Sequence, residues 1–221
     1  DLSASTTQVF WAVNSYGLVL ALAIITSGRL GDRFGHRRLF LLGTLILATA
    51  SLACGVATSP LVLIASRLLP GLGAGMLVPQ TLTLIGVTFP ENIRGRAVGI
   101  WGSIAGTASV IGPLAGGVLI DGLSWRWVFF INLPIAILVV VLGLRSLPIE
   151  VVRSVRVDFV GTFLAGIGLV ALLYGSLQGP HAGWDPLTIA CLPFAVFCLF
   201  AFFRYERRVD QAYAVFPQSL S

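Results

Sequence analysis

Long apolar stretches recur along the whole chain, and they limit more than any other feature how it can fold. Each is long enough, as an α-helix, to cross a hydrocarbon core of about 30 Å. Glycine and proline inside these stretches do not exclude helices, because membrane helices tolerate both residues better than soluble helices do. Seven spans are predicted, at residues 8–28, 38–57, 60–89, 95–120, 127–147, 157–178 and 186–204.

The composition supports lipid as the solvent. Charged residues make up 10% of the chain, hydrophobic residues make up 57%, and the mean hydropathy is +0.94. An ordinary soluble domain carries about 25% charged residues. We therefore expect an all-α integral membrane protein, a helical bundle whose surrounding partner is the lipid bilayer.

All fourteen basic residues are arginines, and their placement predicts the topology. One arginine, Arg67, lies inside a span. The predicted loops on one side of the membrane contain a single basic residue, Arg126. The other twelve occupy loops that alternate along the chain and so share a side, which the positive-inside rule places in the cytoplasm. This predicts a multi-pass protein of the cell membrane. A nucleic-acid-binding surface would not alternate in register with apolar spans, so no nucleic acid is expected as a partner.

The segment GRLGDRFGHRRLF at 28–40 has a faint copy, GVLIDGLSWRWVF, at 117–129. The offset is 89 residues in sequence numbering, and it matches Gly28 with Gly117, Asp32 with Asp121 and Arg37 with Arg126. Three predicted spans separate the two copies, so they are expected on opposite faces of the membrane. This arrangement is typical of an inverted-topology repeat.

The first copy combines glycines, an aspartate and a basic cluster in a tight loop. Gly28, Gly31 and Gly35 permit close backbone approach and a sharp reversal, and Asp32 can pair with the surrounding arginines. The segment resembles the G-x-L-a-D-r-x-G-r-r signature of the major facilitator superfamily, in the loop after that family's second helix. His36 replaces a usually basic residue, so its charge would depend on pH. The alternative is a solvated basic turn that only sets topology. The resemblance implies a conformational-switch loop made of Gly28, Leu30, Asp32, Arg33, Gly35, Arg37 and Arg38.

Arg67 lies in LIASRLLPGLGAGMLVPQ, well inside a predicted span. A charge within the membrane is costly and is by default a functional residue. The segment resembles the family's fourth helix, whose buried arginine is associated with proton coupling. The alternative is that Arg67 snorkels to the outer interface. Gly71, Gly73 and Gly75 predict a small-residue face that packs against neighbouring helices.

The run GIWGSIAGTASVIGPLAGGVL resembles the antiporter signature of the family's fifth helix, which is typical of exporters. Ala108 replaces one expected glycine. Pro113 can bend the helix, and the glycines allow close helix contact; generic small-residue packing is the alternative. The residues that match the signature are Gly99, Gly112, Pro113, Gly116 and Gly117.

SWRWVFFINLPIAI resembles the start of the sixth helix in the fourteen-span drug:proton antiporters, and Trp125 and Trp127 suit an interfacial belt. Two more apolar runs follow, and no second signature loop appears after them, as expected if two extra central spans are present. The predicted organisation has three parts. Residues 1–147 form helices two to six of an N-terminal six-helix half whose first helix is missing, 148–204 form two central spans, and 205–221 form a cytoplasmic tail toward the missing second half.

The sequence gives little support for a catalytic or metal-binding function. His36 and His181 are expected on opposite sides of the membrane, and no Cys/His cluster, carboxylate pair or phosphate loop is present. Cys54, Cys191 and Cys198 lie in apolar runs and are read as packing residues. The prediction is a protein that is not an enzyme and has no cofactor or metal.

The resemblance implies a proton-driven multidrug efflux transporter that exports small amphipathic compounds by alternating access. Its partners would be the substrate, protons and the remaining half of the same transporter. No aspartate or glutamate lies in the middle of a predicted span, so the proton-carrying carboxylate is not identified. The alternative is a non-transporting membrane module, either a sensor or the membrane half of a lipid-modifying enzyme.

Overall fold

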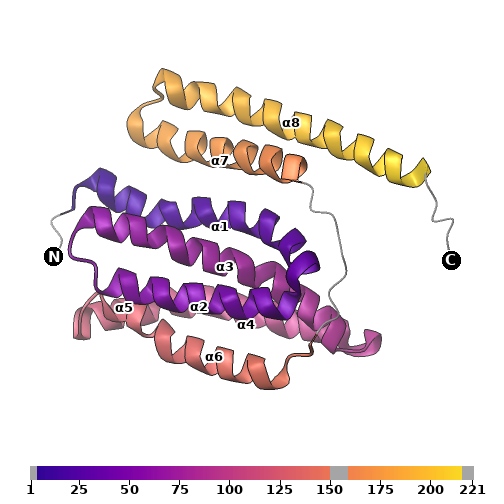
Figure 1. Cartoon of the computed structure of the whole chain (residues 1–221). Helices are drawn as coiled ribbons and strands as arrows, with labels where there is room; N and C mark the ends of the chain where they lie inside the picture. Colours follow the sequence, from indigo (N-terminus) through magenta and orange to yellow (C-terminus); the bar gives the residue numbers. More distant parts are fainter. Residues whose placement is uncertain (1–3, 150–158, 216–221) are drawn as a thin grey trace. The chain divides into compact units, whose positions relative to one another are not determined.

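The computed structural model describes residues 4–149 and 159–215, which are mostly helical and contain no β-strand (Figure 1). Within these residues, seven helical segments are long and apolar enough to cross a membrane, as predicted. The predicted all-α membrane class is therefore confirmed. The helices are α1 Thr6–Phe34, α2 His36–Gly55, α3 Pro60–Thr88, α4 Glu91–Gly122, α5 Trp127–Phe130, α6 Asn132–Ser146, α7 Phe159–Ala182 and α8 Pro186–Val215.

Two predicted loops are much shorter than expected. The segment 29–38 is not a loop, because α1 continues to Phe34 and only Gly35 separates it from α2. Gly35 has φ 95°, a left-handed conformation that residues with a Cβ rarely adopt, so one glycine completes the reversal. The segment 90–96 is likewise helical from Glu91 onward, after Pro90. The arginines of both segments therefore lie on helices, in ordered positions.

The fifth predicted span, 127–147, is one span made of two helices, α5 and α6. Pro134 explains the interruption, because it has no N–H to donate to the carbonyl of Phe130, where α5 ends. The two helices are joined through Ile131.

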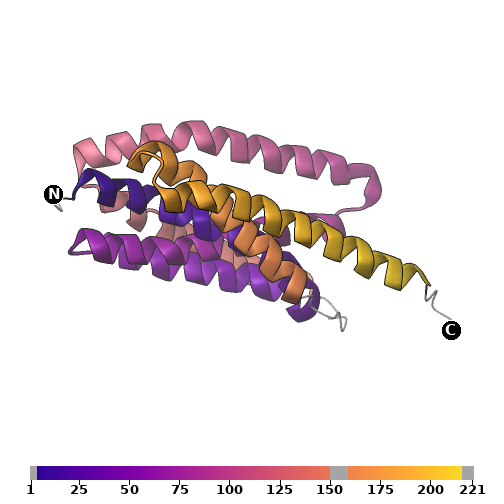
Figure 2. The ribbon, with the colours of Figure 1, turned by 90° about the horizontal axis from the view of Figure 1, so that it is seen from above.

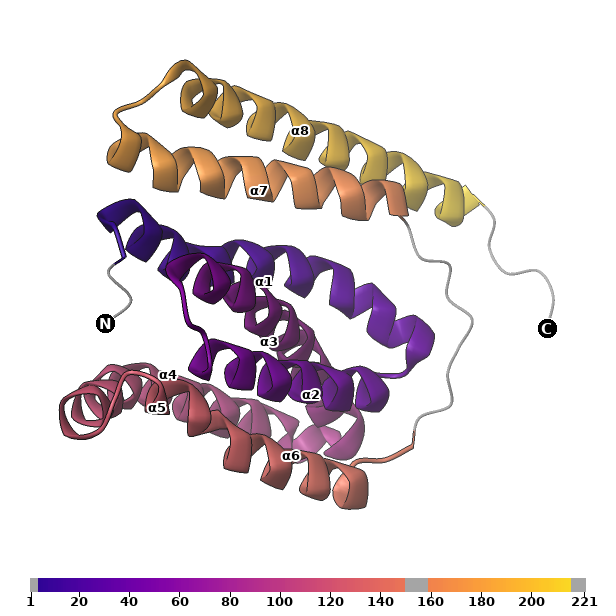
Figure 3. The ribbon, with the colours of Figure 1, turned by 60° about the vertical axis from the view of Figure 1, so that its left-hand side comes forward.

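The chain forms two compact units, Asp1–Val155 and Arg156–Ser221. In the first unit α3 packs against both α1 and α2, and α2 also packs against α6 (Figure 3). The helix ends at Gly35, at the start of α4 and at the end of α6 lie together at one end of this unit (Figure 1). We call this the basic end, because it holds Arg29, Arg33, Arg37, Arg38, Arg94, Arg96 and Arg145.

The glycines of α3 form the predicted packing face, and they serve two neighbours. A Cβ on Gly75 would lie 2.9 Å from the carbonyl oxygen of Leu20 on α1. A Cβ on Gly73 would lie 2.7 Å from the carbonyl oxygen of Gly43 on α2. Side chains at either position would separate the backbones, so small residues set the spacing of all three helices.

The second unit is an antiparallel hairpin of α7 and α8, seen in Figure 2. A Cβ on Gly168 would meet Leu199, and one on Gly175 would meet Leu192. Asp185 begins α8, because its Oδ1 accepts a hydrogen bond of 2.9 Å from the backbone N–H of Thr188. Cys198 is buried against this seam, in agreement with a packing role.

Candidate functional site

The signature loop contains two glycines with definite structural reasons. Gly35 makes the reversal, and Gly31 is buried where a Cβ would collide with the side chains of Gln80 and His36. Gly28 shows no such contact, since apart from adjacent residues and the local helix backbone no atom lies within 4 Å of its Cβ position. Two of the three glycines therefore have the predicted close approach or reversal.

Asp32 and His36 face each other across one turn at the basic end, with Nε2 of His36 3.3 Å from Oδ1 of Asp32. On its other side, Nδ1 of His36 lies 2.6 Å from Oε1 of Gln80 on α3. A neutral imidazole carries one N–H, whereas an imidazolium could donate to both oxygens. The pairing of Asp32 with an arginine that the sequence suggested is replaced here by a pairing with His36.

Gln80 connects this loop to the interior of the unit. Its side chain is fully buried, and Nε2 donates a 2.6 Å hydrogen bond to the backbone carbonyl of Ser27. The hydroxyl of Ser27 in turn lies 2.8 Å from the carbonyl oxygen of Gly75. That carbonyl lacks its usual helical donor, because Pro79 stands four residues further on.

Ser27 and Gln80 were not among the predicted site residues. A polar side chain in an apolar span must find a partner, because lipid offers none. The dipeptide Pro79–Gln80 inside a span was therefore an available signal. The partner itself, on α1, could not be read from the sequence.

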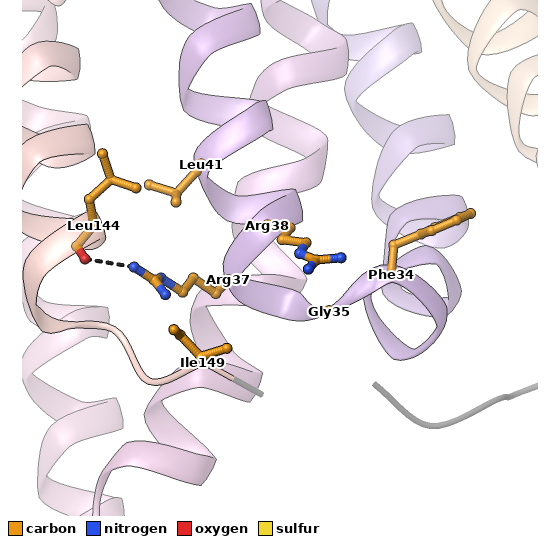
Figure 4. Close-up of a pocket in the computed structure, with 7 residues that line it drawn as sticks. All are labelled: Phe34, Gly35, Arg37, Arg38, Leu41, Leu144 and Ile149. Carbon is orange, nitrogen blue, oxygen red and sulfur yellow. Dashed lines mark hydrogen bonds between the residues drawn. The ribbon is translucent and has the colours of Figure 1, made fainter. Parts of the chain in front are cut away.

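Two arginines of the loop, Arg37 and Arg38, point in different directions (Figure 4). Arg33 stacks on the ring of Phe34, 5.4 Å from its centre, and Arg37 donates a 2.6 Å hydrogen bond to the carbonyl of Leu144 on α6. Arg38 is exposed, and Leu30 is half-buried. Between Arg37 and Arg38 lies a cavity of about 260 Å³ whose wall includes Leu41, Leu144 and Ile149.

Arg67 lies in the second turn of α3, toward the end of the unit opposite to Gly35. Its Nε donates a 2.7 Å hydrogen bond to the carbonyl of Ala12 on α1. The guanidinium lies 5.7 Å from the ring centre of Tyr16 and 5.8 Å from that of Phe129. The side chain is therefore held between helices, and it is not in contact with Asp32.

A cavity of about 280 Å³ opens beside Arg67. Its walls come from α1, α3, α4 and α5 and the turn before α5, and they are mostly apolar. Arg67 is the charged residue of the lining, which also includes Val13, Leu63, Ile120, Trp125 and Phe129.

The antiporter-signature helix α4 is largely exposed within the first unit. None of its residues is buried, and within the first unit it contacts α3 and α5. Apart from adjacent residues and the local helix backbone, no atom lies within 4 Å of the Cβ positions of its signature glycines, which are Gly99, Gly112, Gly116 and Gly117. The neighbouring helix expected against this face is thus not among the helices of the first unit, and Pro113 is likewise exposed.

The geometry does not bring the predicted site residues into one place. The loop, Arg67 and the glycine face of α4 form three separate features, joined by α1 and α3. Among the described residues, no group of three or more His, Cys, Asp or Glu side chains could hold a metal ion.

A family model described as the Major Facilitator Superfamily matches residues 1–205. The chain belongs to this superfamily. It is 40% identical over 95% of its length to the puromycin resistance protein pur8 of Streptomyces alboniger, and it covers 42% of that protein. It is 37% identical over 96% of its length to the tetracenomycin C resistance and export protein of Streptomyces glaucescens, and it covers 40% of that protein. It is 34% identical over 99% of its length to the methylenomycin A resistance protein of Bacillus subtilis (strain 168), and it covers 47% of that protein.

The resemblance to the major facilitator superfamily is thus confirmed, and the relatives named here are drug and antibiotic resistance proteins. The chain spans less than half the length of each of these three relatives. Together with the seven helices, membership places this chain in a multi-pass membrane protein.

Proposed function

We propose that the protein containing this chain exports small amphipathic compounds in exchange for protons, by alternating access. The cavity beside Arg67 is the observation that carries this proposal. Membership of the superfamily supports transport, and the names of the relatives support resistance compounds as the substrate class.

The cavity has the chemistry that an amphipathic compound needs. Its walls are apolar and include the rings of Trp125 and Phe129, which suit the apolar part of a ligand. Arg67 presents a guanidinium whose Nε is tethered to Ala12, leaving further N–H groups on the same side chain. These can meet a hydrogen-bond acceptor of the substrate or a carboxylate that carries the proton.

The proton-carrying carboxylate is not in the middle of a described span. We therefore assign proton exchange to a carboxylate elsewhere in the full protein, with Arg67 as the residue that senses it. The glycine face of α4 would press against a helix of the remaining half, since only glycine permits such close contact.

The organisation proposed for the full protein follows the sequence analysis. Residues 1–147 would belong to the N-terminal half, 148–204 would form two central spans, and 205–221 would lead to the second half. The basic end would face the cytoplasm, which stays a prediction of the positive-inside rule.

The test uses the full-length protein in proteoliposomes that hold an acidic interior. We expect a cationic fluorescent dye to be taken up by the molecules inserted with their cytoplasmic side outward, and uptake to stop when a protonophore removes the gradient. Arg67→Ala should lose this uptake, whereas Leu68→Ala, which changes an exposed neighbour on the same helix, should keep it. Dye movement that ignores the gradient would exclude proton coupling. No movement of any dye or proton would favour a non-transporting module.

A further inference from the structure

Arg37 and Arg126 are equivalent positions of the internal repeat, separated by the offset of 89 residues. In the structure they make equivalent hydrogen bonds at opposite ends of the first unit. Nη2 of Arg37 donates to the carbonyl of Leu144 at 2.6 Å, and Nη2 of Arg126 donates to the carbonyl of Ala57 at 2.9 Å.

The two bonds are reciprocal. Arg37 is in the first turn of α2 and binds the last turn of α6, which Figure 4 shows. Arg126 immediately precedes α5 and binds the chain just after the end of α2. Each arginine thus precedes or begins one helical span and holds the carboxyl end of the other.

Both acceptors need such a donor. Leu144 belongs to the last turn of α6, where carbonyls lose their helical partners, and Pro148 four residues later has no N–H. Ala57 is 1% exposed and lies beyond the last turn of α2, out of reach of water. A cation at either place also opposes the partial negative charge of a helix carboxyl terminus.

The packing around the two bonds repeats the same symmetry. A Cβ on Gly143, near the end of α6, would lie 2.9 Å from the side chain of Leu41 on α2. A Cβ on Gly55, at the end of α2, would collide with the ring of Phe130 on α5. Leu41 and Phe130 are again related by the offset of 89. Each of the two spans, α2 and α5–α6, therefore offers a glycine to a large side chain of the other.

One further bond lies beside the Arg126 contact. Nδ2 of Asn132 on α6 is 3.3 Å from the hydroxyl of Ser51 on α2. The guanidinium of Arg126 also stacks on the ring of Trp125, 4.4 Å from its centre. The two spans are thus joined near both ends.

We infer that Arg37 and Arg126 are positioning residues that clamp α2 and α6 into one rigid pair, which moves as a unit during transport. The motion rests on the proposed function, but the clamp itself does not. The clamp also gives a reason for the position of Arg126. It is the one basic residue in the predicted loops on its side of the membrane.

The test measures the distance between spin labels on the two helices by pulsed electron paramagnetic resonance. The full-length protein, without native cysteines and reconstituted in lipid nanodiscs, carries labels at Leu45 of α2 and Leu138 of α6, which are both exposed. We expect a single narrow distance, unchanged between acidic and alkaline buffer and by added dye. Each single variant, Arg37→Gln or Arg126→Gln, should keep it, because one clamp remains.

The double variant Arg37→Gln with Arg126→Gln should show a broader or split distance distribution. The change should exceed the sum of the changes in the two single variants. Contacts a full helix length apart have additive effects unless they hold one rigid body. The charge-matched control is Arg37→Gln with Arg145→Gln, since Arg145 is exposed in the same last turn of α6, and it should stay narrow. A narrow distribution in the clamp double variant, or a wild-type distance that changes with pH, would overturn the inference.

If the double variant Arg37→Gln with Arg126→Gln fails to insert into the membrane, the double variant Arg37→Lys with Arg126→Lys, the lysine pair, is measured instead. Both cations and donors remain in it, so the narrow distance should return. A broad distribution in the lysine pair would show that the cationic hydrogen bonds do not hold the helices. If the wild-type protein shows a single narrow distance but transports no dye, the result would count against the proposed function and leave the clamp intact.

Discussion

The hydroxyl of Ser27 on α1 lies 2.8 Å from the carbonyl oxygen of Gly75 on α3, the carbonyl that Pro79 deprives of its helical donor. The same hydroxyl lies 2.5 Å from the carbonyl of Ala23, which already has a donor within its own helix. The bond to Gly75 is therefore the one that satisfies an otherwise open group. It permits a proline inside α3 while α1 remains packed against it.

Ser27→Ala should destabilise the protein by about 1–3 kcal/mol, because it leaves a buried carbonyl without a partner. Pro79→Ala restores the N–H that Gly75 needs, so the double variant should regain much of the loss. Thermal unfolding of the purified full-length protein measures both. Thr26→Ala is the matched control, since the Thr26 hydroxyl bonds only to carbonyls of its own helix. Equal losses for Ser27→Ala and Thr26→Ala would contradict the assignment.

Asp32→Asn should strongly reduce efflux while changing stability by less than about 1 kcal/mol, because polar contacts of a half-exposed side chain contribute little to folding. The variant keeps the size of the side chain but removes the anion that faces His36. Efflux from cells and membrane levels of the protein are the two measurements. Asp121→Asn changes the equivalent residue of the repeat and should leave efflux normal. Normal efflux by Asp32→Asn would reduce the loop to a topology signal.

Arg67→Ala should abolish proton-coupled efflux, and Arg67→Lys should restore only part of it. Lysine keeps a positive charge, but it lacks the planar guanidinium that lies between Tyr16 and Phe129 while donating to Ala12. Efflux rates and expression levels of both variants provide the check. Normal export by both would mean that Arg67 has only a structural or interfacial role.

Gly116→Val should abolish efflux and produce a proton leak in reconstituted vesicles, with normal expression. Nothing within the first unit opposes the new side chain, so a loss of efflux would point to a helix outside this unit. Overpacking such a contact costs about 1–3 kcal/mol. Ala115→Val is the control, because Ala115 is exposed and points about 100° away from Gly116 around α4. Wild-type efflux by Gly116→Val would mean that the signature face contacts lipid.

The two ends of α4 offer a test of orientation. Glu91 and Gly122 are both exposed and lie at the two ends of one helix. In a background without native cysteines, a cysteine at Glu91 should be shielded from an impermeant thiol reagent in intact cells, and one at Gly122 should react. Both should react in permeabilised cells. The reverse pattern in intact cells would overturn the positive-inside assignment.

The sequence by itself determined the number and approximate bounds of the spans, because crossing lipid requires a minimum length of apolar helix, and that length is a local property. It also determined the packing face at Gly71, Gly73 and Gly75, since glycines inside an apolar helix leave room for a neighbour. The weak repeat was readable for the same reason, as residue identities at a constant offset need no fold.

Only the tertiary structure decided the partners. Gln80 meets His36 across 44 positions of sequence, and Arg37 meets Leu144 across 107. Such pairs depend on which helices face each other and at what depth in the membrane the residues lie. The hydropathy of the sequence gives neither the facing helix nor the depth. The extent of the signature loop was also decided there, because α1 gains more by continuing its hydrogen bonds to Phe34 than by unwinding at the arginines. In a membrane, each buried polar group must find a partner in another helix, and that requirement is met only once the helices are packed.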